Sequence, residues 1–297
     1  MDFLGQNEIL VQSTLTNFLL AMSLLVCLRV GVFSFGGLAC FGIGAYFTAV
    51  ASIHWGWGAF SSISMAMLIS MALGALLAPI VRGLTGLAMG MATIAFTLIA
   101  GVAARNGGEL TGGAEGLFGI PIMVGTGTAL LIATAMTILL ALSERGRMGR
   151  MIEAVRVDNE LSLSTGISVQ TVRFVAFVVS GAIGALGGGL AASFRSIVTP
   201  LDLGFGPVIL ALTMLIVGGA RSWLGALIGA VFFTWLPTVL TSVGEWQGVV
   251  YGVVVAAAAI WVPGGAVGVA TDLRRRLAVK RRVRNAIPVK PKKAMVS

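Results

Sequence analysis

Residues 84–104 read LTGLAMGMATIAFTLIAGVAA, a run of 21 residues without a single charged side chain. A helix of about 20 apolar residues is long enough to cross the hydrocarbon core of a bilayer. Runs of similar length lie on both sides of this one, and they are about twice as long as the roughly 10-residue alternating strands of a membrane barrel. The stretch therefore predicts a membrane-spanning α-helix, and its neighbours predict an all-α protein with many spans.

The composition of the chain also favours a membrane protein. Of its 297 residues, 57% are hydrophobic and 10% are charged, and the mean hydropathy is +0.99. A soluble domain carries about 25% charged residues, so this chain has too few charges to cover a surface in water. Many of its glycines lie inside the apolar runs, where small residues let helix backbones approach closely.

Nine apolar runs are candidates for spans, and the second and seventh are the weakest. Cytoplasmic loops collect Lys and Arg. With nine spans and the end of the chain inside, all of the 20 basic residues except Arg105 and Arg195 fall on the cytoplasmic side. We therefore expect a periplasmic N-terminus and a cytoplasmic C-terminus. The runs are about 9–28, 36–53, 60–81, 84–104, 122–142, 173–193, 204–220, 223–243 and 246–262.

A strongly basic tail follows the last run. It reads RRRLAVKRRVRNAIPVKPKK at 274–293. No folded basic module precedes it, which argues against nucleic-acid binding, and we expect it to lie beside anionic lipid headgroups in the cytoplasm. The chain thus divides into a transmembrane domain, 1–268, which includes a polar segment at 143–172, and a basic cytoplasmic tail, 269–297.

Several kinds of chemistry lack the residues they need. The interiors of the nine runs contain no Lys, Arg, Asp, Glu or His, which disfavours proton coupling. Sodium coupling is weakened but stays open, since sodium sites can be built from backbone carbonyls. A phosphate-binding loop needs a Lys after its glycines, and the first Lys of the chain is Lys280. No Ser–His–carboxylate arrangement surrounds the single histidine, His54. We expect no enzymatic activity, no metal and no bound cofactor, and any ATP must be used by a partner subunit.

The segment at 143–172 is the longest polar stretch between runs. Met148, Met151, Ile152 and Val155 fall on one face at helical spacing, and Gly166 suits a helix end. This pattern predicts a short amphipathic helix, which would either press on a soluble partner or lie flat on the membrane.

The same segment resembles a loop of a known family. GRMIEAVRVDNELSLSTGI, 149–167, is similar to GRALRAIREDEIAAEALGI, the cytoplasmic loop of ABC importer permeases of the branched-chain amino-acid (Liv-type) family. Gly37 departs from the family, which commonly has a histidine there, and Leu161 and Ser162 replace two small alanines. Four further stretches agree in the family's order: FSFGGLACFGIGAY (33–46), LTGGAEGLFGIP (110–121), VTPLDLGFGPVILALTMLIVGGARSWLGALIGA (198–230) and VPGGAVG (262–268).

The resemblance implies an ABC importer permease fold in a bacterial inner membrane. Two permease subunits, often a heterodimer, form one pathway, a periplasmic binding protein delivers substrate, and ATPase subunits dock from the cytoplasm. The residues it implies for ATPase coupling are Gly149, Arg150, Glu153, Ala154, Arg156, Asp158 and Gly166. Weaker candidates for the pathway or its gate are Thr111, Gly112, Gly113, Gly116, Gly42, Gly44, Gly218 and Gly219. The glycine loop at 111–116 either lines the periplasmic gate or is only a compact connector, and the connector is the favoured interpretation.

The substrate that the resemblance implies is a branched-chain or other hydrophobic amino acid. Two alternatives stay open. The first is a permease of the same type for urea, short amides or another small polar solute, because an uncharged, glycine-rich pathway suits any solute of low net charge. The second is a secondary carrier or channel that works without an ATPase. Membrane lipid is a partner in every case.

Overall fold

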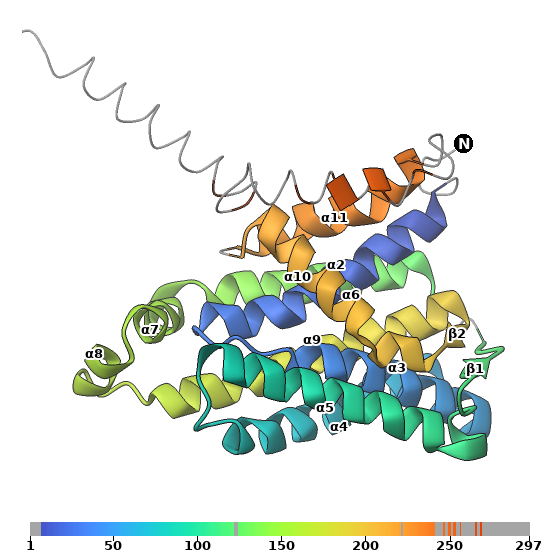
Figure 1. Cartoon of the computed structure of the whole chain (residues 1–297), viewed down its shortest axis with the longest axis horizontal. Coiled ribbons are helices and arrows are strands. Elements are labelled where there is room, and N and C mark those ends of the chain that lie inside the picture. Colours follow the sequence, from blue (N-terminus) through green and yellow to red (C-terminus); the bar gives the residue numbers. More distant parts are fainter. Residues whose placement is uncertain are drawn as a thin grey trace, which may run out of the picture.

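Long apolar helices make up most of the described chain (Figure 1). The structure is a computed structural model, and it describes residues 7–121, 124–220 and 222–240 and a few single positions between 246 and 268. The prediction of an all-α polytopic membrane protein is confirmed. Six of the described helices are long and apolar enough to cross a membrane: α2 (Glu8–Arg29), α3 (Gly36–Trp55), α4 (Ala59–Ile80), α5 (Gly86–Asn106), α6 (Thr126–Ser143) and α9 (Val169–Arg195).

The two ends of the helix bundle carry different short elements (Figure 1). At one end lie two polar helices, α7 (Gly146–Val157) and α8 (Asn159–Ser164). At the other end, β1 (Leu117–Phe118) pairs antiparallel with β2 (Ile197–Val198). Two 3₁₀ turns, η1 (Gly108–Leu110) and η2 (Pro200–Leu203), flank this small ribbon in sequence.

Helix α9 lies in the centre of the bundle, against α2, α3 and α4. Its sequence has glycines at 181, 184 and 188, and residues three or four apart share one helix face. A Cβ atom at Gly184 would lie 2.1 Å from the carbonyl oxygen of Gly37, and one at Gly188 would lie 1.8 Å from that of Phe41. The backbones of α9 and α3 therefore touch, which only glycine allows at these positions.

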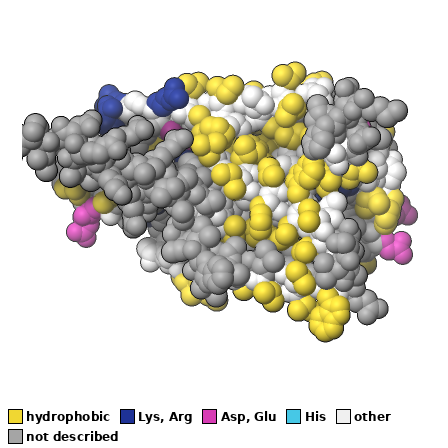
Figure 2. Space-filling model, turned by 90° about the horizontal axis from the view of Figure 1, so that it is seen from above, with side chains coloured by type: hydrophobic (Ala, Val, Ile, Leu, Met, Phe, Trp, Pro, Cys, Tyr) yellow, Lys and Arg dark blue, Asp and Glu magenta, His cyan; other side chains and the backbone are white. Residues whose placement is uncertain are grey.

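The outer helices α4, α5 and α6 expose apolar side chains, such as Leu76, Met91 and Leu131. On the face seen in Figure 2, the described surface between the two ends is largely hydrophobic or uncharged, and Lys and Arg show near one end. Exposed apolar side chains in this number are not expected on a protein surface in water. It is the surface expected of helices in contact with lipid.

The described residues hold fewer spans than the nine predicted for the whole chain. Helices α10 (Phe205–Gly218) and α11 (Trp223–Val239) are bent by 117° at a short break, so the pair forms a broken span or a re-entrant loop. At 1.5 Å per residue, the 14 residues of α10 extend about 21 Å, less than the roughly 30 Å of the hydrocarbon core. The described residues thus hold six spans, or seven with the pair counted as one.

The chain can reverse at this break because of its glycines. Gly219 has φ of +108°, which side-chain-bearing residues rarely adopt, and a Cβ at Gly218 would lie 1.9 Å from the carbonyl oxygen of Gly225. Hydropathy alone reads two such helices as two separate spans. The predicted ninth run, 246–262, falls mostly outside the described residues, and the basic tail, 269–297, falls wholly outside them.

Candidate functional site

The polar segment that follows α6 begins with a sharp corner. Arg145 is extended, and Gly146, the first residue of α7, has φ of +69°. A Cβ at Gly149 would lie 1.9 Å from the carbonyl oxygen of Glu144. Gly149, predicted as a coupling residue, is therefore a glycine for a local reason: the first turns of α7 pass directly against the end of α6.

The segment forms two helices where the sequence predicts one. Asp158 is extended and ends α7, and its side chain accepts hydrogen bonds from the backbone N–H groups of Glu160 (2.9 Å) and Leu161 (3.1 Å). Asp158 is therefore the N-cap of α8. Gly166, with φ of +80°, follows the last turn of α8, as the sequence predicts. The prediction of one helix up to Gly166 is wrong because the carboxylate of Asp158 starts a second helix.

The helix pair is fixed to the transmembrane helices. Arg29, the last residue of α2, forms an ion pair with Glu144. In the turn after α2, a Cβ at Gly31 would lie 3.5 Å from the Cα of Arg156, so α7 rests against that turn. On the predicted apolar face, Val155 is only 2% exposed. Met151 and Ile152 are half-buried and Met148 is exposed, so this face packs against the protein at its Val155 end, an arrangement that neither sequence interpretation includes.

Four of the predicted coupling residues line one groove of about 450 Å³ beside α7. Within it, the carboxylate of Glu153 lies 3.7 Å from the guanidinium of Arg156. The remaining predicted residues play other parts: Ala154 is half-buried in α7, Asp158 caps α8 and Gly166 ends it. The groove is lined by Arg29, Glu144, Gly146, Gly149, Arg150, Ile152, Glu153 and Arg156.

Apolar side chains project from the tip of the helix pair, and the sequence analysis did not select them as site residues. Leu161 is 63% exposed and Leu163 59% exposed, and Val157 is exposed beside them. Ser162 points inward, and its hydroxyl donates to the carbonyl oxygen of Asp158 (2.7 Å). Of the two departures from the family pattern in this loop, Leu161 thus changes the surface and Ser162 does not. The sequence signal that could have pointed to this apolar surface is the presence of Leu161 and Leu163 within a polar segment.

The predicted gate loop at the opposite end is a tightly packed connector. The hydroxyl of Thr111 donates to the carbonyl oxygen of Ala104 (2.6 Å). Gly112, Gly113 and Gly116 all have positive φ, and a Cβ at Gly116 would lie 2.2 Å from the carbonyl oxygen of Val198, in β2. These glycines are required by the backbone of the turn.

The other predicted pathway glycines also lie at close contacts. A Cβ at Gly42 would lie 2.2 Å from the side chain of Leu203, and one at Gly44 would lie 2.5 Å from the Cα of Ala185. Gly218 and Gly219 form the break between α10 and α11. Their packing accounts for these glycines without a solute, and their role in the pathway stays a prediction.

The described part of the chain holds no group of three or more His, Cys, Asp or Glu side chains placed to bind a metal ion. Its single histidine, His54, lies in the last turn of α3, next to the exposed ring of Trp55. Tryptophan is enriched at this level of membrane helices, where the apolar core meets the headgroups.

Comparisons with known proteins agree with this architecture. The chain is 25% identical over 268 residues to the high-affinity branched-chain amino acid transport system permease protein LivM of Salmonella typhimurium. It is 24% identical to the protein of the same name from Escherichia coli. Each alignment covers 79% of this chain and 63% of the relative, so the chain spans less than two thirds of their length. No solved structure matches significantly.

A family match covers most of the described residues. Residues 7–259 match the family described as branched-chain amino acid transport system / permease component. This range includes all six long helices and the α7–α8 pair. The chain therefore belongs to the permease family of branched-chain amino acid ABC transport systems.

Proposed function

We propose that this chain is a membrane-spanning subunit of an ATP-driven importer in a bacterial inner membrane, and that α7 and α8 are where an ATPase subunit docks. The observation that carries the proposal is the α7–α8 pair itself. It is polar, it lies beyond the ends of an apolar helix bundle, and it is joined to that bundle by packing and an ion pair. Its exposed leucines offer an apolar contact to a partner.

Two connections would carry movement of α7 and α8 into the membrane. The ion pair between Arg29 and Glu144 links the start of the pair to α2. At the other end, the short stretch after Gly166 leads directly into α9 at Val169. Because α9 packs along α2, α3 and α4, a tilt of α9 shifts the contacts of the central helices together. The ATP would be bound and hydrolysed by the partner, and this chain would bind no cofactor.

The orientation follows from placing α7 and α8 in the cytoplasm. The N-terminus of α2 is then periplasmic, and the excess of Lys and Arg in 274–293 separately favours a cytoplasmic tail. The end that carries β1 and β2 faces the periplasm, where a substrate-binding protein would deliver its ligand. A second permease subunit would complete the pathway.

The proposed substrate is a branched-chain or another hydrophobic amino acid. The names of the two relatives support this class, because each is a branched-chain amino acid permease protein. The apolar interiors of the described helices also suit a zwitterion of zero net charge, which needs backbone dipoles and no buried counter-ion.

Co-purification tests the docking site. We expect the tagged ATPase subunit to retain the wild-type permease and to lose Leu161→Asp and Glu153→Arg. The matched control is Leu110→Asp, because Leu110 is 59% exposed at the opposite end. Gly149 is a poor test position, because any side chain there displaces Glu144.

Liposomes that contain the purified complex test the transport reaction. We expect leucine uptake that requires ATP and the ATPase subunit. In the co-purification experiment, equal retention of all permease variants by the ATPase subunit would contradict the docking site. Leucine movement down its gradient through the permease alone would contradict ATP-driven import and would indicate a carrier or channel.

A further inference from the structure

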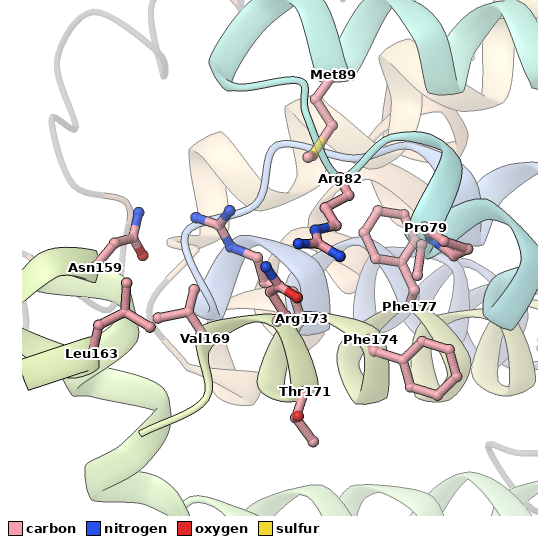
Figure 3. Close-up of a pocket in the computed structure, with 12 residues that line it drawn as sticks. Pro79, Arg82, Met89, Asn159, Leu163, Val169, Thr171, Arg173, Phe174 and Phe177 are labelled. Carbon is pink, nitrogen blue, oxygen red and sulfur yellow. The ribbon is translucent and has the colours of Figure 1, made fainter. Parts of the chain in front are cut away.

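A second cavity lies at the α7–α8 end of the bundle, separate from the groove beside α7. Its volume is about 500 Å³, within the range of about 300–1000 Å³ typical of small-molecule sites. It lies between the end of α4, the start of α5, the helix α8 and the first turns of α9 (Figure 3). None of the predicted coupling residues lines it.

Two arginines face this cavity. Arg82 comes from the turn between α4 and α5, and Arg173 comes from the second turn of α9; Figure 3 shows both side chains reaching into the same space. Within the described residues, no carboxylate lies within salt-bridge distance of either one. The Nε atom of Arg173 is buried and has no hydrogen-bond partner.

This arrangement calls for an anion. Two guanidinium groups that share one cavity repel each other, and a buried N–H donor without a partner costs about 1–3 kcal/mol. A phosphate in the cavity offsets this repulsion by accepting hydrogen bonds from the terminal N–H groups of the guanidinium groups, since arginine binds phosphate through parallel, charge-assisted hydrogen bonds.

The level of the cavity in the bilayer points to a lipid as the source of the phosphate. Arg173 and Arg195 are both in α9 and lie about 33 Å apart along its axis, close to the thickness of the hydrocarbon core. Arg173 therefore lies at headgroup level. The wall of the cavity is apolar on its membrane side, with Pro79 and Phe177, and the adjacent Ile80 and Leu87 are strongly exposed to the lipid. Acyl chains fit this surface.

We propose that Arg82 and Arg173 bind the phosphate of an anionic phospholipid, whose acyl chains lie along α4 and α5. Asn159 and Leu163 of α8 line the same cavity. A bound headgroup would thus tie the start of α9 to the turn before α5, next to α8. The lipid would brace α8 at a site separate from the Arg29–Glu144 ion pair. Binding itself does not depend on the proposed docking of an ATPase.

Native mass spectrometry of the delipidated, detergent-solubilised full chain tests the proposal. Phosphatidylglycerol and phosphatidylcholine are added in turn and the bound lipid is counted. We expect the wild-type chain to prefer phosphatidylglycerol, and the double variant Arg82→Gln, Arg173→Gln to lose about tenfold or more in affinity for it. The matched control is Arg145→Gln, Arg147→Gln, which removes two exposed charges at the same end but outside the cavity.

The control is expected to bind phosphatidylglycerol as the wild type does. The variant Arg82→Lys, Arg173→Lys keeps both charges, and we expect it to retain more lipid than the Gln variant. Each variant is compared with the wild type by circular dichroism and size-exclusion elution, so that only folded protein is scored.

Four results would overturn the proposal. Equal losses in the two Gln double variants would mean general surface attraction. Equal binding of phosphatidylcholine would remove the role of the anion. Full displacement of the lipid by millimolar inorganic phosphate would indicate a site for a free anion. Displacement by the purified ATPase subunit would assign the arginines to a protein partner.

Discussion

Arg29 at the end of α2 forms an ion pair with Glu144 at the start of the polar corner, and it joins two positions that lie far apart in the sequence. The side chains are 14% and 29% exposed, so water screens the pair only in part. Exposed pairs contribute about 0–1 kcal/mol, whereas breaking a fully buried pair costs about 3–5 kcal/mol. This ion pair links Glu144, which lies just before the α7–α8 pair, to the end of α2.

Loss of the ion pair is expected to weaken both folding and coupling. Arg29→Gln leaves the carboxylate of Glu144 without its partner and should cost about 1–3 kcal/mol, between the exposed and buried cases. Thermal unfolding in detergent measures this cost, and ATP-driven uptake in liposomes should fall with it. Arg29→Glu combined with Glu144→Arg should recover part of both. Unfolding and uptake at wild-type values in Arg29→Gln would contradict a linking role.

The break between α7 and α8 depends on the side chain of Asp158. Asp158→Ala removes two hydrogen bonds to the first turn of α8 and should cost about 1 kcal/mol locally. We expect faster amide hydrogen exchange at 159–164 and weaker retention of the ATPase subunit, with normal membrane insertion. Asp158→Asn is the control, since asparagine also caps helices. Unchanged exchange in the Ala variant would show that the surrounding packing alone holds α8.

The glycines of α9 that touch the backbone of α3, Gly184 and Gly188, are expected to tolerate no added methyl group. In Gly188→Ala the new carbon would collide with the backbone of Phe41, which cannot move as a side chain can, and the cost should reach about 1–3 kcal/mol or more. Gly127→Ala in α6 is the control, because nothing lies within 4 Å of its Cβ position. Thermal unfolding should show a clear loss for the first variant and no loss for the second. Equal midpoints would contradict backbone contact between α9 and α3.

Gly37 departs from the family pattern, which commonly has a histidine there. Neighbouring side chains occupy the space that a side chain at Gly37 would need. A Cβ there would lie 2.3 Å from the hydroxyl oxygen of Ser180, which itself donates to the carbonyl oxygen of Ser23 (2.7 Å). Gly37→Ala should therefore destabilise the protein, and adding Ser180→Ala should recover part of the loss. A double-mutant cycle by thermal unfolding measures this coupling. Strictly additive effects would mean that the two positions do not share space.

The long helices could be predicted from the sequence because an apolar run in lipid has few other stable forms. The run at 84–104, for example, is α5, Gly86–Asn106. The reversal between α10 and α11 could not be predicted in the same way, since hydropathy gives the length of an apolar run but not its direction. The sequence indicates Gly218 and Gly219 as candidates for the pathway or its gate, whereas in the structure they turn the backbone.

The sequence predicts the position of the candidate site in the chain, but it does not predict how the segment folds. Polarity alone placed it at 143–172, and four of the predicted residues share a groove. The split at Asp158 depends on a side chain that accepts hydrogen bonds from the following turn, and the spacing of apolar residues does not reveal such a bond. For Gly42 and Gly44, the sequence cannot separate a glycine that lines a pathway from one that lets two helices touch, because both positions lack a side chain.

Site-specific photocrosslinking tests most directly whether an ATPase subunit docks on the tip of α7 and α8. A photoreactive amino acid is placed at Leu161 in one complex and at Leu110 in another, since both side chains are exposed but at opposite ends. We predict an adduct with the combined mass of permease and ATPase subunit from position 161 and none from position 110. No ATPase adduct at 161, or equal adducts at both positions, would contradict the account.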